Sequence, residues 1–138
     1  MENKMPIEYD IIKEKNTVIV VGSGVISATD IINHLDSLAE DDRYTAPMKK
    51  LVDYRDIESI NILPDEAEII AQRKKKLSKK FSGEKCAFVS PSDLTYGTAR
   101  VHQALIDGTD INTQVFRSFE EALDWLNITM DHGSKIND

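Results

Sequence analysis

The sequence has few of the residues that cross-link a chain or place it in a membrane. Of its 138 residues only Cys86 is a cysteine, which excludes a disulfide framework and zinc sites built from cysteines. No apolar run approaches the roughly 18 residues that a membrane helix needs, so we expect no integral membrane segment. Because the first ten residues hold no basic stretch followed by an apolar one, we expect a cytoplasmic protein.

Positive charge is also scarce. The chain has 17 Lys and Arg against 24 Asp and Glu, a formal net charge of -7 at pH 7, which argues against a general nucleic-acid binder. Its hydrophobic fraction of 41% and charged fraction of 30% are typical of a soluble globular protein. A chain of this length buries enough surface for one core without a disulfide or a metal. We therefore expect a single domain over residues 1–127 and a flexible tail over 128–138.

Groups that carry common catalytic chemistry are sparse as well. The three histidines, His34, His102 and His132, follow no predicted strand and have no His or Cys partner at metal-ligand spacing. We expect His34 and His102 to be exposed helix residues, the chain to hold no metal, and the protein not to be an enzyme. The alternative is an enzyme of unrecognised type, for which Asp53 and Asp56 are the only clustered acid-base candidates.

The only glycine-rich segment after a strand lacks the full pattern of a phosphate-binding loop. Gly22-Ser23-Gly24 follows an apolar run, but Ser27 stands where a dinucleotide fingerprint has its third glycine. We interpret the segment as a turn that lets the strand leave the sheet. The sequence also has no P-loop, so we expect no cofactor.

What the sequence does contain is an alternation of strand and helix patterns. Apolar runs predict strands over 8–13, 17–21, 50–54, 86–89 and 114–116. Helical periodicity predicts four helices, which begin at Ser27, Leu63, Ser92 and Ser118; the second of these extends to Phe81. The order β-β-α-β-α-β-α-β-α implies an α/β fold with a mixed, mostly parallel sheet of about five strands and an N-terminal hairpin.

Polar residues gather where the parallel strands end, which is the edge at which open α/β sheets bind ligands. Helices capped by Ser92 and Ser118 offer free backbone N–H groups to an anion, and Arg55, Arg100 and Arg117 add positive charge. This pattern is typical of a site for a small anionic ligand. The alternative is that the serines only cap helices and that Arg55 pairs with a neighbouring aspartate.

A basic run occupies residues 73–80, where six of eight residues are Lys or Arg. Cations near the C-terminus of a helix interact favourably with its dipole, so the run fits a charged surface helix, with Lys74 snorkelling from its apolar edge. The alternative is a docking patch for an acidic partner or a membrane surface, with Lys75, Lys76 and Lys79 as the contact residues.

Four stretches of the sequence resemble a known family. They read PIEY at 6–9, LVDYRD at 51–56, SPSDLTYGTAR at 90–100 and VFRSFEEALDWL at 115–126. Together with the order of elements, they are similar to the SpoIIAA-like group of small bacterial proteins, which is related to STAS and Sec14-like domains. The resemblance covers roughly residues 6–127 and implies a STAS-like fold.

The resemblance implies two functions. STAS proteins bind protein partners in regulation and are switched by phosphorylation, but the acceptor position falls near Ile62 or Leu63, and the glycine that follows it is replaced by Pro64. Ser59, the nearest hydroxyl, is expected in a loop. We therefore expect a non-catalytic regulatory module that binds a protein partner and lacks the usual phosphoacceptor; a homodimer formed through a sheet edge or the second helix is compatible with the pattern.

The alternative function is that of a Sec14-like carrier for a small anionic or lipid ligand. Its pocket would lie at the carboxyl edge of the sheet and be lined by polar and basic residues. The candidate ligand-binding residues are Arg55, Asp56, Ser92, Tyr96, Arg100 and Arg117.

Overall fold

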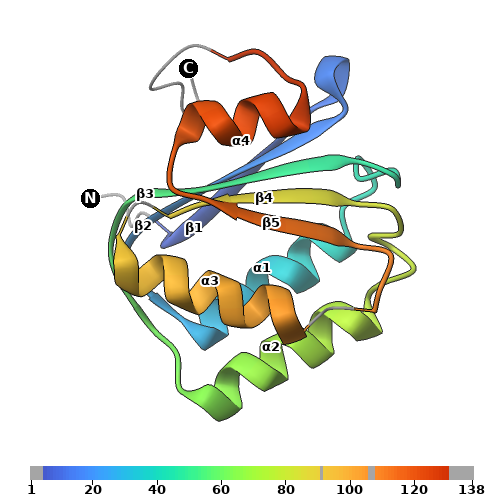
Figure 1. Cartoon of the computed structure of the whole chain (residues 1–138). Helices are drawn as coiled ribbons and strands as arrows, with labels where there is room; N and C mark the ends of the chain where they lie inside the picture. Colours follow the sequence, from blue (N-terminus) through green and yellow to red (C-terminus); the bar gives the residue numbers. More distant parts are fainter. Residues whose placement is uncertain (1–4, 91, 106–107, 131–138) are drawn as a thin grey trace.

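A computed structural model describes residues 5–90, 92–105 and 108–130 (Figure 1). The strands are β1 (Ile7–Ile12), β2 (Thr17–Ser27), β3 (Lys49–Asn61), β4 (Lys85–Val89) and β5 (Asn112–Phe116). The helices are α1 (Ala28–Ala39), α2 (Pro64–Lys76), α3 (Asp93–Leu105) and α4 (Phe119–Leu126), and a short 3-10 turn, Lys13–Lys15, joins β1 to β2. The order of strands and helices predicted from the sequence is confirmed.

The five strands form one sheet in the order β1-β2-β3-β4-β5. β1 pairs antiparallel with β2, as the short connection between them predicts, and every other neighbouring pair is parallel. Each parallel pair is joined by a helical crossover, so the chain crosses the sheet one strand at a time. The sheet is therefore the mixed, mostly parallel α/β sheet that the sequence predicts.

Helices cover the two faces of the sheet unequally. α1, α2 and α3 lie on one face, and α4 lies on the other (Figure 1). Because side chains alternate along a strand, β3 sends Lys50, Val52 and Tyr54 toward the three-helix face and Leu51 toward α4. The apolar core under α4 consists of Ile19, Leu51, Ala87, Val89, Phe119, Ala122, Leu123 and Leu126.

β2 and β3 are longer than predicted. Gly22-Ser23-Gly24 is part of β2, not a turn that ends it, and the pairing with β3 shifts register on both sides of Ser23. A side chain at position 22 could not be accommodated, because its Cβ would lie 2.6 Å from the Tyr54 ring. Beyond these bulges the two strands stay paired, so Ser59 lies within β3 and not in a loop.

The ends of the helices follow local signals in the sequence. Ser27 and Asp30 form a reciprocal capping box at the start of α1, and the Ser118 hydroxyl accepts a hydrogen bond from the Glu121 amide. α2 ends at Lys76, earlier than predicted. The chain then turns so that Phe81 packs edge-on against Tyr44, with ring centres 5.1 Å apart.

The first residues of the segment predicted to be a flexible tail pack against the core. Ile128 and Met130 contact the core under α4, and the Ile128 amide donates to the Leu123 carbonyl. Residues 131–138, which include His132, lie outside the described residues. In the part of the chain that is described, no helix is both long enough and apolar enough to cross a bilayer.

Candidate functional site

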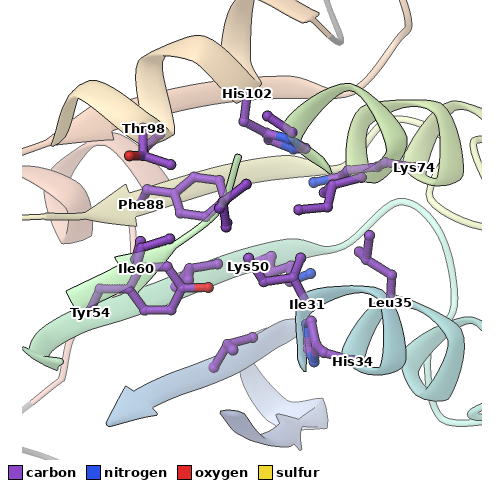
Figure 2. Close-up of a pocket in the computed structure, with 16 residues that line it drawn as sticks. Ile31, His34, Leu35, Lys50, Tyr54, Ile60, Lys74, Phe88, Thr98 and His102 are labelled. Carbon is purple, nitrogen blue, oxygen red and sulfur yellow. The ribbon is translucent and has the colours of Figure 1, made fainter. Parts of the chain in front are cut away.

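A cavity lies between the sheet and helices α1, α2 and α3 (Figure 2). It encloses about 650 Å³ that protein atoms do not fill, part of it open to solvent. Most of its wall is apolar, because the inward faces of three helices and three strands meet there. The apolar lining residues are Val20, Ile31, Leu35, Val52, Ile60, Ile62, Ala67, Ile70, Phe88 and Ala99.

Four basic side chains stand at one end of the cavity. Figure 2 shows Lys50, Lys74, His34 and His102 on one side and Tyr54 on the other. These four residues, called the basic end below, come from β3, α2, α1 and α3. Since Lys50 is the second residue of β3, the basic end lies toward the amino ends of the parallel strands.

Lys74 is buried against a carboxylate. Its exposed fraction is 2%, and its Nζ lies 3.4 Å from Oε1 of Glu84, which is fully buried. The Tyr44 hydroxyl donates a hydrogen bond of 2.6 Å to the other oxygen of Glu84. The expectation that Lys74 snorkels to solvent is wrong, because Glu84 gives its ammonium group an interior partner.

Lys50 is equally buried, with 2% of its surface exposed, but it forms no ion pair or side-chain hydrogen bond with any described residue. Its Nζ lies 5.9 Å from the centre of the Phe81 ring. Burial lowers the pKa of Lys50; the charge of Glu84 opposes this shift and that of Lys74 adds to it. Lys50 is therefore a buried amine that faces an apolar cavity.

The two histidines of the basic end are uncharged near neutral pH. Burial, assisted by the charges of Lys50 and Lys74, holds the pKa of His34 well below its usual value of 6.5. The same causes, with Lys74 ahead of Lys50, lower the pKa of His102 to about 3. His34 is 8% exposed, and neither of its ring nitrogens has a hydrogen-bond partner among the described residues.

The prediction of exposed histidines is thus wrong for His34, while His102 is partly buried and stacks edge-on with Phe88. Each neutral imidazole has one nitrogen that donates a hydrogen bond and one that accepts. The basic end therefore offers donors from both lysines together with adaptable polar groups from both histidines.

The six predicted ligand-binding residues lie elsewhere. None of them is among the described residues that line the cavity. Arg55 forms two hydrogen bonds with Asp53, at 2.9 and 2.8 Å, and its guanidinium carbon lies 3.8 Å from the centre of the Phe119 ring. The alternative in which Arg55 pairs with a neighbouring aspartate is confirmed.

Arg117 and Tyr96 do come together at the carboxyl edge. The Arg117 guanidinium stacks on the Tyr96 ring at 4.3 Å and donates to Asp93 at 2.7 Å. Arg100 donates to Gln103 at 3.0 Å, and Asp56 and Ser92 are exposed. A ligand at this edge would have to compete with these ion pairs, and the role of the six residues in ligand binding stays a prediction.

The predicted docking residues are exposed. Lys75 and Lys76 lie in the last turn of α2, and Lys79 lies in the turn that follows the helix. Lys74 belongs to the same basic run, but its side chain points into the interior. The three predicted docking lysines therefore lie on the surface while Lys74 does not. Of the acid-base candidates, Asp53 is buried and paired with Arg55.

Comparisons with known proteins show the fold. One solved structure that resembles this one is an uncharacterised protein of the DUF3478 family, with a SpoIIAA-like fold, from Shewanella loihica PV-4. The match covers 91% of this chain and 98% of that protein, at 19% sequence identity and a TM-score of 0.58. No family model matches the sequence, and a search of curated proteins found no match. The chain therefore has a SpoIIAA-like fold, as the resemblance in its sequence implies.

Proposed function

We propose that this protein is a non-catalytic module of SpoIIAA-like fold that binds a small, largely apolar molecule in the cavity between the sheet and helices α1–α3. The observation that carries this proposal is the cavity itself. Its wall is apolar over most of its surface and carries a few convergent polar groups, which is typical of a site for a small, largely apolar molecule. A bound apolar molecule would restore contacts that the cavity walls lack.

The lining supports a ligand with an apolar body. Ile31 and Leu35 come from α1, Ile70 comes from α2, and Phe88 adds an aromatic surface from β4. Ile31 and Phe88 are partly exposed while Leu35 and Ile70 are buried, so the lining extends from the surface into the core. This function corresponds to the carrier alternative, with the ligand against one face of the sheet and not at its carboxyl edge.

The test uses a dye and two alanines of α3. Nile red is neutral and fluoresces strongly in apolar surroundings, so we expect it to bind the wild type at one site. Ala99 lines the cavity and is 6% exposed, whereas Ala104 is exposed on the same helix. Ala99→Phe should fill part of the cavity and weaken dye binding by about tenfold or more, whereas Ala104→Phe should leave it unchanged.

If Ala99→Phe fails to fold, Ala67→Phe places the same ring in the cavity from α2, at a partly exposed position that tolerates a larger side chain more easily. Equal dye binding by the wild type and both cavity variants would overturn the proposal. Native mass spectrometry of the protein purified from cells gives a second readout, because a retained ligand adds mass that is lost on unfolding.

The exposed lysines favour a second function, the binding of a protein partner. Lys75, Lys76 and Lys79 form a surface group that is available to an acidic protein. Charge reversal at all three positions should weaken capture of such a partner in a pull-down experiment. If capture of the partner is unchanged, these three lysines do not form its binding surface.

A further inference from the structure

The basic end of the cavity contains more positive than negative charge. Lys50 and Lys74 each contribute an ammonium group, and Glu84 contributes one carboxylate. Oε2 of Glu84 accepts a hydrogen bond from Tyr44, and Oε1, which has no hydrogen-bond partner among the described residues, lies 3.4 Å from the ammonium nitrogen of Lys74. The ammonium group of Lys50 has no counter-ion among the described residues.

The other titratable groups around this end do not change the balance. His34 on α1 and His102 on α3 are neutral at pH 7, because burial lowers the pKa of each. Burial also raises the pKa of the Cys86 thiol on β4 and of the Tyr44 and Tyr54 hydroxyls, so these three groups carry no charge at that pH. Burial lowers the pKa of Lys50 as well, and a bound anion would favour its protonated form. With both lysines protonated, the basic end carries one unbalanced positive charge.

An isolated ammonium group in an apolar interior is unfavourable, because it loses its hydration and gains nothing in return. Lys50 also has three N–H donors, and it makes no side-chain hydrogen bond with a described residue. An anion bound in the cavity would supply both a counter-ion and hydrogen-bond acceptors for Lys50. The cavity wall beyond the basic end is apolar, so the rest of such an anion would have to be apolar as well.

Resting on the proposed function, we propose that the ligand is an amphiphile with one terminal carboxylate, which binds at Lys50 while its apolar chain extends along the cavity toward Tyr54 and Ile60. A carboxylate carries the single negative charge that the basic end lacks. A phosphate monoester carries nearly two charges at neutral pH and would leave one unbalanced. The imidazoles of His34 and His102 are placed to donate further hydrogen bonds to the carboxylate or to ordered water.

The test compares three probes that share a ten-carbon chain and differ only in their head group: decanoate, 1-decanol and decyl phosphate. By isothermal titration calorimetry at pH 7 we expect the wild type to bind decanoate at least about tenfold more tightly than either other probe. Lys50→Met keeps the length of the side chain but removes its charge. This variant should lose the preference and bind decanoate no more tightly than decanol.

The control variant is Lys49→Met, because Lys49 is the neighbouring residue of β3 and its side chain lies on the opposite face, where it donates to the Asn127 carbonyl. It should retain the preference for decanoate. Lys50→Met removes a buried charge, so we expect its unliganded form to melt at the same temperature as the wild type or higher. This measurement separates loss of binding from loss of folding.

The outcomes distinguish this inference from the proposed function. If the wild type binds decanoate and decanol equally, or decyl phosphate most tightly, the assignment of a single carboxylate is overturned and the cavity's binding function stands. If Lys50→Met keeps the preference for decanoate, the role of Lys50 is overturned. If neither Nile red nor any of the three probes binds, the proposed function itself is overturned.

Discussion

The two faces of the sheet are built differently. Against α4, a helix of eight residues, the core is closely packed, and Leu51, Ala87 and Leu126 have no exposed surface. Against α1, α2 and α3, the core contains a partly open cavity and the buried side chains of Lys50, Lys74 and Glu84. Lys50 and Leu51 are adjacent in sequence, yet they belong to opposite faces and to these two different environments.

The difference indicates a division of tasks. Close apolar packing stabilises a fold, whereas cavities and unpaired buried charges destabilise it and are found where a protein binds something. The core under α4 is mostly apolar, and its one buried charge among the described residues, Asp53, is paired with Arg55. The face covered by three helices has the cavity and the buried Lys50, which has no counter-ion among the described residues. We infer that the α4 core contributes more to the stability of the fold than the face with the cavity.

The largest effect is expected from removing the buried carboxylate. Glu84→Gln leaves Lys50 and Lys74 close together without a counter-ion and should lower the free energy of unfolding by about 3–5 kcal/mol, measured by urea denaturation. The control is Asp36→Asn, which breaks the partly exposed ion pair between Asp36 and Arg73; Arg73 lies beside Lys74 on α2. This substitution should lower the free energy of unfolding by less than about 1 kcal/mol. Equal losses would show that Glu84 is not paired in the interior.

A smaller effect on stability is expected from leucine-to-alanine substitutions that compare the core under α4 with the core that contains the cavity. Leu51→Ala removes a fully enclosed side chain under α4 and should cost about 4 kcal/mol. Leu35→Ala removes the same atoms from the cavity wall, where part of the side chain already faces empty space, and should cost about 2 kcal/mol. Urea denaturation of both variants measures the difference; a greater loss for Leu35→Ala would mean that the cavity face is packed as closely as the other.

The smallest effect concerns pH. Because the pKa of His102 is about 3 in the folded protein and near 6.5 in the unfolded chain, only the unfolded chain gains a proton there as the pH falls through 6.5. Unfolding is thereby favoured, and this group alone should lower stability by about 1 kcal/mol between pH 6.5 and pH 5.5. His102→Gln removes that contribution, so its stability should fall less over this interval in urea denaturation.

Carboxylates titrate in the wild type and in the variant alike, so the difference between the two isolates the histidine. An identical pH dependence would mean that the imidazole of His102 titrates normally in the folded protein. His34→Gln should act in the same direction, because the pKa of His34 is also lowered by burial.

Much of the fold could be predicted from local patterns. The alternation of apolar strand runs and helical stripes gave the order of elements, since each period reflects which side chains face the core. The capping signal at Ser27 and Asp30 marked the start of α1 correctly. The length of β2 was missed, because Gly22 and Gly24 are typical of turns, whereas here a glycine is required for the Tyr54 ring to pack on the strand.

The candidate site was harder to predict. A lysine in a strand and a lysine in a basic run are usually solvated, and only their positions in the assembled fold show that Lys50 and Lys74 point into the interior. One signal was available: Lys50 shares the alternation of Val52 and Tyr54, so a helix covering that face would bury all three. The sequence pattern favoured the carboxyl edge instead, because polar residues directly follow the ends of the predicted strands.

The sequence by itself determined the fold class, the order of the elements and the ends of several helices, because these depend on periodicity and on contacts between residues a few positions apart. Only the tertiary structure decided which charges are buried and where the cavity lies. Those properties depend on how three helices distant in sequence meet over one face of the sheet. Burial then sets the state of each group, which leaves Glu84 with a partner and Lys50 without one.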